Sequence, residues 1–207
     1  MPGGGPWSHN LHYHRLVLGQ VPAGCRRALD VGCGEGQLAR ALADRVPAVV
    51  GLDRDAPTLD RARRAGGPGG LAYVLGDLLD APFPPGSFDL VASIATLHHG
   101  DTGTGLRSLR DLVRPGGRLV VVGLARSRSL ADVPYDVAGY AVSRVYRRTR
   151  AHEPVTAPTV WPPPLTYGQT RRTARAALPG VRYGRHLFFR YSLTWDDPGA
   201  AQRTGPG

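Results

Sequence analysis

The chain has 207 residues, of which 42% are hydrophobic, and a formal net charge of +10. This length favours one domain with one substantial core, and this apolar content excludes wholesale disorder. The longest apolar run, Leu119 to Ala125, is much shorter than the ~18 residues that a membrane helix needs. Met1 is followed by Pro-Gly-Gly-Gly-Pro, so we expect no secretory signal. The two cysteines, Cys25 and Cys33, predict a reducing cytoplasm rather than a disulfide framework.

The positive charge is concentrated in the last part of the chain. Residues 1–124 hold 13 arginines and 11 acidic residues, whereas residues 125–207 hold 13 arginines and 5 acidic residues. A basic region of this kind is compatible with a nucleic acid, an anionic small substrate or a solvated surface. Because no RNA-binding signature surrounds these arginines, we favour the solvated surface and expect no nucleic-acid partner.

Strands and helices alternate through the first 124 residues. A short amphipathic helix is predicted over residues 7–21. Apolar runs predict strands at 26–31, 48–52, 71–75, 88–94 and 118–124. Helical spacing predicts helices at 37–46, 56–65, where Asp55 is the expected N-cap, and 105–113, which the Arg-Pro-Gly-Gly segment 114–117 should end. This alternation is typical of a parallel sheet covered on both faces.

The remaining residues follow a different pattern. A helix is predicted over 130–150, and the proline-rich segment 154–164 should be extended. A second helix is predicted over 166–178 with Thr166 as its N-cap. Alternating apolar and polar residues then predict two strands, at 181–187 and 188–195. We expect residues 196–207 to be a disordered tail.

The strongest motif runs from Asp30 to Gly36, with glycines at 32, 34 and 36, where a strand enters a turn and then a helix. Glycines allow the backbone to approach a ligand closely, and the first N–H groups of a helix favour a negative group. Gln37 stands where a dinucleotide fingerprint has its third glycine, which counts against a nicotinamide or flavin cofactor.

Two further acidic residues follow strands. Asp53 ends the second strand, where a carboxylate can accept both hydroxyls of a ribose. Its structural alternative is a helix cap, but Asp55 fills that role better. Asp77 follows the third strand, where it can accept a hydrogen bond from an adenine amino group or act only as a turn carboxylate.

These motifs continue with Gly-Asp-x-x-x-x-Pro-Phe, Ser-Phe-Asp-Leu-Val, Leu-His-His and Arg-Pro-Gly-Gly-Arg-Leu. Their order and spacing over residues 26–124 resemble class I S-adenosylmethionine-dependent methyltransferases, closest to the small-molecule branch that includes ubiquinone/menaquinone-type C-methyltransferases. Segments 7–14 and 160–164 look like an uncharacterised bacterial subgroup. The resemblance implies an α/β fold, a doubly wound, Rossmann-like sheet of seven strands with the last one antiparallel. We expect one domain with an N-terminal lid helix (1–24), a cofactor-binding core (25–124), a helical insertion after the fifth strand (125–165), and a closing helix and strand pair (166–195).

The resemblance also implies a set of residues around S-adenosylmethionine: Asp30, Gly32, Gly34 and Gly36 under its methionine part, Asp53 at the ribose, Arg54, Asp77 and Leu78 at the adenine, and Ser93 and Ile94 facing the methionine part.

Candidates for the acceptor side are fewer. His98 and His99 follow the fourth strand, at the edge where ligands bind, and either is a candidate general base because histidine titrates near neutrality. Paired histidines here also occur across unlike substrates. His12, Tyr13 and Trp161 are candidates for contact with the acceptor. Their structural alternatives are a helix packed on the sheet and a rigid polyproline connection. The spacing of His9, His12 and His14 does not suit a metal site.

We therefore predict methyl transfer from S-adenosylmethionine to a small organic acceptor by in-line displacement, in a protein that is a monomer or homodimer with no membrane partner. Two alternatives remain open. One is an RNA-modifying methyltransferase that binds phosphates with the arginine-rich C-terminal part. The other is a non-catalytic S-adenosylmethionine-binding protein, because no residue is firmly assigned as a base.

Overall fold

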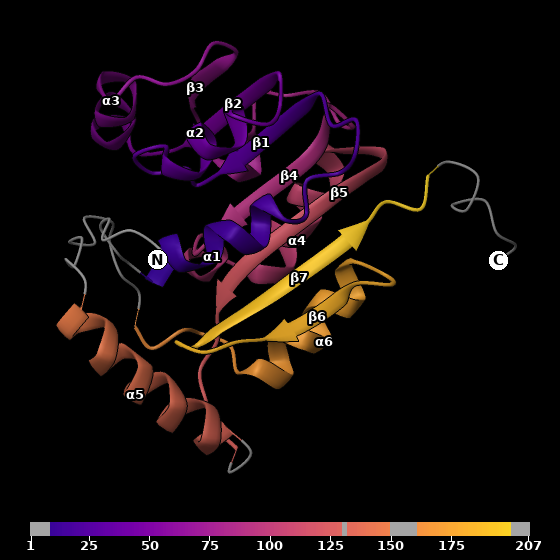
Figure 1. Cartoon of the computed structure of the whole chain (residues 1–207). Helices are drawn as coiled ribbons and strands as arrows, with labels where there is room; N and C mark the ends of the chain where they lie inside the picture. The colour runs from indigo at the N-terminus through magenta and orange to yellow at the C-terminus, as the bar shows by residue number, and fades with distance from the viewer. Residues whose placement is uncertain (1–8, 130–131, 150–160, 200–207) are drawn as a thin grey trace, which may run out of the picture.

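The computed structural model describes residues 9–129, 132–149 and 161–199 (Figure 1). Its centre is a seven-stranded sheet with the order β3-β2-β1-β4-β5-β7-β6. Strands β1 to β5 run parallel, and β7 is antiparallel to both β5 and β6. The predicted doubly wound sheet with an antiparallel last strand is confirmed.

The strands follow the apolar runs of the sequence. They are β1 (Arg27–Val31), β2 (Ala48–Asp53), β3 (Leu71–Leu75), β4 (Phe88–Ile94), β5 (Val113–Leu124), β6 (Arg182–Arg185) and β7 (Arg190–Asp196). Every residue of β4 is buried, because the strand is central and helices cover both faces of the sheet.

The helices are α1 (His9–Leu18), α2 (Gln37–Ala43), α3 (Ala56–Arg64), α4 (Thr102–Leu112), α5 (Val133–Thr149) and α6 (Tyr167–Ala177), with short 3-10 turns η1 (Leu78–Asp80) and η2 (Leu97–His99). Two predicted caps are confirmed. The Thr58 N–H donates to Asp55 Oδ2 over 3.0 Å at the start of α3, and Thr166 forms a capping box with Gln169 at the start of α6.

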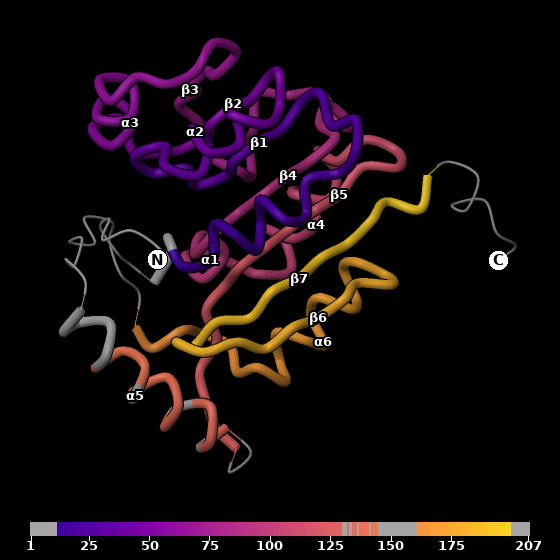
Figure 2. Tube along the Cα trace, viewed as in Figure 1, coloured from indigo at the N-terminus to yellow at the C-terminus, as the bar shows by residue number. Residues whose placement is uncertain are grey.

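Two hydrophobic clusters fill the two sides of the sheet. One joins the sheet to α4 and α6 through residues such as Leu106, Leu109 and Ala174. The other joins it to α1 and α2 through residues such as Val17 and Leu42. Figures 1 and 2 show α5 beyond these layers, where Gly139 lies against the backbone of the turn between β6 and β7.

Some boundaries differ from the prediction. Helix α4 begins at Thr102 rather than 105, because Asp101 Oδ1 accepts the Thr104 N–H over 2.7 Å and caps the helix there. Strand β5 begins immediately after α4, so segment 114–117 forms an irregularity inside the strand, and the β4–β5 register shifts between Phe88 and Leu90. The predicted tail does not begin at residue 196, because β7 ends at Asp196 and Asp197 is buried.

Within the part of the chain that the structure describes, no helix has both the length and the apolar character needed to cross a membrane.

Candidate functional site

A cavity of about 790 Å³ opens at the carboxyl ends of β1, β2, β3 and β4. This is the edge at which doubly wound sheets bind their ligands. The cavity brings together most of the residues predicted around a cofactor, namely Asp30, Gly32, Gly34, Asp53, Arg54, Asp77, Leu78 and Ile94. Residues more than 60 positions apart in the sequence therefore surround one space.

The glycine loop forms the floor of this cavity. Gly32, Gly34 and Gly36 all adopt left-handed backbone angles, with φ of 70°, 53° and 75°. A Cβ at Gly32 would collide with the Thr96 side chain, and one at Gly36 with the Tyr73 side chain. A Cβ at Gly34 would meet no atom of the chain within 4 Å. Gly32 and Gly36 thus serve internal packing, whereas Gly34 leaves space beside the cavity.

Asp30 lies at the inner wall of the cavity and is only 2% exposed. Its Oδ2 is buried and accepts no hydrogen bond from any described residue. Burial, and then the neighbouring charge of Asp53, raise the pKa of Asp30 to about 7, while a backbone hydrogen bond from Ala39 lowers it. A cation with N–H donors that enters the cavity would stabilise the ionised form of this carboxylate, because it supplies both an opposite charge and hydrogen bonds.

Asp53 is held in a fixed orientation at the end of β2. Its Oδ2 accepts the Gly34 N–H over 2.8 Å, and its Oδ1 accepts the Asp55 N–H over 3.0 Å. A carboxylate oxygen has more than one acceptor position, so both oxygens can still accept hydroxyl groups. This geometry suits a ribose.

Asp77 and Arg54 lie at the outer rim. Asp77 Oδ1 accepts the Leu79 N–H over 2.9 Å at the start of η1. Its Oδ2 is 4.0 Å from Arg54 Nη1, and both side chains are well exposed. Such a pair adds little stability and is easily separated by a ligand.

The two residues predicted at the end of β4 have different environments. Ile94 lines the cavity. Ser93 does not; its side chain is fully buried, and its hydroxyl donates to the Val31 carbonyl over 3.1 Å. The side chain of Ser93 therefore does not line the cavity in which we expect the cofactor. Ala95 and Thr96 line the cavity instead, and Ala95 has a left-handed φ of 55°.

The two histidines also differ. His99 lines the cavity, and burial together with the Arg54 charge lowers its pKa. His98 is 9% exposed, and its Nδ1 is buried without a hydrogen-bond partner among the described residues. Burial, His99 and Arg190 lower the pKa of His98 to about 4. The rings are 4.1 Å apart, so His98 lies behind His99.

The N-terminal helix is both packed and part of the site. Tyr13 is 4% exposed and its hydroxyl donates to the Leu187 carbonyl over 2.7 Å, so its side chain belongs to the core. His12 is exposed, and its ring lies 5.6 Å from that of Phe188. His14, which the sequence did not indicate, lines the cavity, and burial lowers its pKa to about 4.

The sequence also missed an ion pair on the cavity wall. Glu35 in the glycine loop lies 2.8 Å from Arg61 of α3, and both line the cavity. Glu35 is inside the quoted motif, but Arg61 has no sequence signal because only the packing of α3 beside the loop brings it there. Among the described residues, no three His, Cys, Asp or Glu side chains are grouped as metal ligands.

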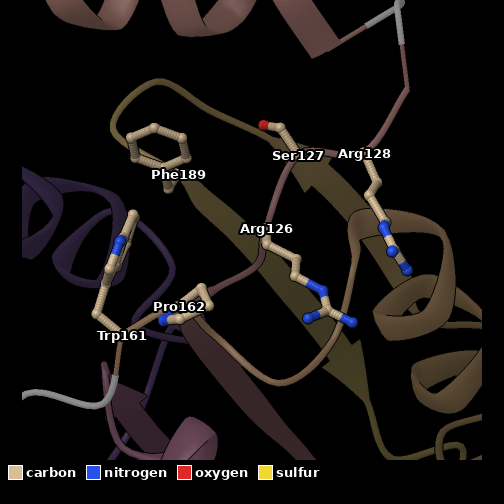
Figure 3. A pocket seen from close by; sticks show the side chains of 6 residues that line it. All are labelled: Arg126, Ser127, Arg128, Trp161, Pro162 and Phe189. Atoms are coloured by element: carbon tan, nitrogen blue, oxygen red, sulfur yellow. The ribbon is translucent and has the colours of Figure 1, made fainter.

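Trp161 lies in a second cavity of about 410 Å³ (Figure 3). Its side chain is 57% exposed and packs edge to face on Phe189, with 5.1 Å between the ring centres. Trp161 and His99, both predicted beside the acceptor, therefore line different cavities.

Comparisons with known proteins agree with this geometry. A family model described as a methyltransferase domain matches residues 29–121. An uncharacterised methyltransferase of Mycobacterium tuberculosis is 39% identical over 194 residues, which is 93% of this chain and 98% of that protein. The demethylmenaquinone methyltransferase of Thermus thermophilus is 39% identical over 112 residues, 52% of this chain and 50% of that one.

The fold has solved counterparts as well. The crystal structure of an S-adenosylmethionine-dependent methyltransferase from Mesorhizobium loti superposes with a TM-score of 0.60 at 20% identity, covering 91% of this chain and 98% of that one.

Proposed function

Because the chain belongs to the class I S-adenosylmethionine-dependent methyltransferases, we propose that it methylates a small organic acceptor at the mouth of the larger cavity. The observation that carries the assignment of the cofactor site is Asp30, whose buried Oδ2 lacks a partner among the described residues and which lines the same cavity as Gly34. A methionine ammonium group satisfies that oxygen with charge and N–H donors.

The other residues divide the cofactor between them. The fixed oxygens of Asp53 accept the ribose hydroxyls, and Asp77 with the Leu78 backbone binds the adenine edge. Arg54 lies beside the adenine, and Ile94 packs against the methionine part. Gly32 and Gly36 act indirectly, because they let the loop pack on Thr96 and Tyr73.

When bound, S-adenosylmethionine supplies a methyl group on a sulfonium, and the bond to sulfur breaks as an acceptor nucleophile attacks in line. The protein aligns the acceptor and excludes water. His99 is our candidate base: it lines the cavity, and its lowered pKa keeps it neutral at pH 7 and able to accept a proton. His98 supports the His99 ring from behind.

Three arginines of the C-terminal part are engaged within the fold, which supports a small acceptor over RNA. Arg182 and Arg185 form ion pairs with Asp196 and Asp132, and Arg190 is 7% exposed. These three guanidinium groups are therefore less available to a phosphate backbone than their number in the sequence suggests. Similarity to a demethylmenaquinone methyltransferase also supports a small organic acceptor. It supports our placement of the chain near the branch of the family that methylates quinones.

The test is ligand-dependent thermal unfolding of wild type and Asp53→Ala with S-adenosylhomocysteine, S-adenosylmethionine or NADH. A ligand at ~100 times its dissociation constant adds about 2.7 kcal/mol, which raises the midpoint of a domain this size by roughly 5–11 °C. We expect that shift with both adenosyl sulfur compounds in wild type, a lost shift in Asp53→Ala, and none with NADH.

Asp60→Ala is the matched control, because Asp60 is an exposed carboxylate on α3 that pairs with Arg63 outside the cavity. Its shift should equal that of wild type. A shift that survives in Asp53→Ala would contradict the assigned site. Salt-sensitive binding of tRNA would contradict the small acceptor.

A further inference from the structure

The second cavity lies along the same edge of the sheet as the cofactor cavity. Ile94, at the end of β4, pairs with Val122 of β5, and the chain continues four residues to Arg126 at the second cavity. Four extended residues span about 13 Å. An acceptor methylated beside Ile94 and His99 is therefore within reach of the second cavity if it is elongated.

One wall of the second cavity is aromatic and is built on strained backbone. Phe188 and Phe189 form the turn between β6 and β7 with φ of 59° and 57°, and the Arg190 N–H closes the turn on the Leu187 carbonyl over 3.3 Å. Hairpins fill these two positions with Asn and Gly, which tolerate positive φ. Burial of Phe188 in the core accounts for the first position. Phe189 is only half-buried, so core packing does not account for the second.

The left-handed backbone at this position determines where the Phe189 ring lies. The ring packs edge to face against the Trp161 ring at the second cavity, with 5.1 Å between the ring centres (Figure 3). Non-glycine residues with left-handed backbone are often found at ligand sites. The two rings together present apolar surface to the cavity, against which a flat apolar group can pack.

The other wall is cationic. Figure 3 shows the side chains of Arg126 and Arg128 extending on the side of the segment away from the two rings. Neither forms an ion pair with any described residue, and none of the described residues that line the cavity is acidic. Arg126 Nε is buried and has no acceptor among the described residues, as is also true of Arg185 Nε. Arg185, however, has the carboxylate of Asp132 at 2.6 Å from its Nη1.

We propose that this second cavity binds the remote end of the methyl acceptor, and that the acceptor is an aromatic carboxylate. Its ring packs against Trp161 and Phe189, and its carboxylate accepts hydrogen bonds from Arg126, since guanidinium and carboxylate groups match in geometry and charge. The inference rests on the proposed methyltransferase function, because it places this end of the acceptor about 13 Å from the cofactor cavity.

The test is calorimetric titration with 2-naphthoate in the presence of saturating S-adenosylhomocysteine, so that the larger cavity is already filled. Neutral 2-naphthylmethanol keeps the ring and removes the charge. We expect 2-naphthoate to bind at least tenfold more tightly than the alcohol. Arg126→Met should abolish that preference, and Arg126→Lys should restore part of it.

Two variants separate binding from folding. Phe189→Gly should weaken 2-naphthoate at least fivefold while the unfolding midpoint stays within about 2 °C of wild type or rises, because glycine adopts the left-handed turn without strain. Arg175→Met removes the same charge from an exposed position on α6 and should change neither affinity.

Three results would overturn the inference: equal affinity for the acid and the alcohol, unchanged 2-naphthoate affinity in Arg126→Met, or no binding of 2-naphthoate to the protein saturated with S-adenosylhomocysteine. If S-adenosylhomocysteine itself does not bind, the proposed function fails. If it binds normally and any of these three results is found, only the assignment of the second cavity fails.

Discussion

A buried aspartate lies at each end of the central strands, and the two differ in how many hydrogen-bond partners the protein gives them. At the amino end of β4, Asp89 Oδ2 accepts the N–H groups of Arg26 and Arg27, each over 2.7 Å, and Oδ1 is paired with Arg114. At the carboxyl end of β1, Asp30 Oδ2 has no partner among the described residues. Both side chains are buried, at 6% and 2% exposure. Burial alone therefore does not distinguish a structural carboxylate from a functional one.

The difference between Asp89 and Asp30 lies in whether the protein itself supplies hydrogen-bond partners to the carboxylate. The bonds of Asp89 connect the start of β1 to β4 and to the first residues of β5. Asp30 keeps acceptor capacity for a ligand at a cost in stability, as binding sites commonly do. The amino end of the sheet is satisfied by the protein itself, whereas we propose that the carboxyl end is satisfied by a bound ligand.

The largest effect expected on folding is that of Asp89→Ala. It leaves two backbone N–H groups and a guanidinium without their acceptor, so we expect a loss of about 3 kcal/mol. For a chain of this size that lowers the unfolding midpoint by roughly 6–12 °C. Calorimetry measures it. The affinity of the folded variant for S-adenosylhomocysteine should be unchanged; a matching loss of affinity would erase the contrast between the two ends.

Asp30→Asn should stabilise the folded protein, in contrast to Asp89→Ala. The pKa of Asp30 is raised from 3.8 to about 7, so the stability that its protonated form contributes is present at low pH and is lost as pH rises towards 7. Asparagine cannot ionise, so the advantage of the variant over wild type should be larger at pH 8 than at pH 5, by about 2.5 kcal/mol, because most of the range in which wild type loses stability, from pH 3.8 to about 7, lies between these two values. Urea unfolding at the two pH values tests this.

The same variant should bind S-adenosylhomocysteine about 30-fold more weakly at pH 8, because it removes the charge that faces the ammonium group. A stabilised variant with unchanged affinity would show that Asp30 is a strained structural residue and not a ligand contact.

The comparison also shows which parts of the site the sequence can reveal. The sequence predicts the turn from Asp30 to Gly36 because its glycines adopt left-handed backbone angles, and this requirement depends only on neighbouring residues. Asp53 is predicted for the same reason: it ends a strand, and Asp55 takes the alternative role of helix cap. These signals are contained in a few neighbouring positions.

Other features depend on packing between distant segments. Every residue of β4 is buried, so no alternation of polar and apolar residues tells which side chain faces the cavity, and the sequence does not show that the Ser93 side chain points away from it. His14 and Arg61 reach the cavity only because α1 and α3 pack beside it. The second predicted strand of the hairpin began too early, because two phenylalanines favour a strand but here form the turn.

A further test of the carboxyl end is the pH dependence of binding. Below its pKa of about 7, Asp30 must release a proton before it can pair with the ammonium group of the ligand, which is charged throughout this range. Two other titratable groups of the cavity, His14 and Cys33, are neutral in that range because burial lowers the pKa of the first and raises that of the second. Burial also lowers the pKa of His99, which lines the same cavity.

Affinity for S-adenosylhomocysteine should therefore rise about tenfold between pH 5.5 and 7, as calorimetric titration would measure. In Asp30→Asn it should change less than twofold. A rise of equal size in both proteins would assign the titration to another group.

The smallest effect comes from a pair of glycines. Gly34 in the cofactor loop and Gly24 before β1 both have left-handed backbone, with φ of 53° and 71°, and a Cβ on either would meet no atom of the chain within 4 Å. Alanine at either position should thus cost the same, about 1 kcal/mol of backbone strain. Only Gly34 lines the cavity.

The two substitutions should therefore agree in stability and differ in binding. We expect Gly34→Ala to weaken S-adenosylhomocysteine about tenfold and Gly24→Ala to leave its affinity unchanged, as titration of both variants would measure. Equal affinities would mean that the space beside Gly34 is ordinary surface. The two variants carry the same backbone strain and differ only in where the added methyl group lies. Unequal affinities at equal stability would therefore show that the backbone at Gly34 leaves space for a ligand.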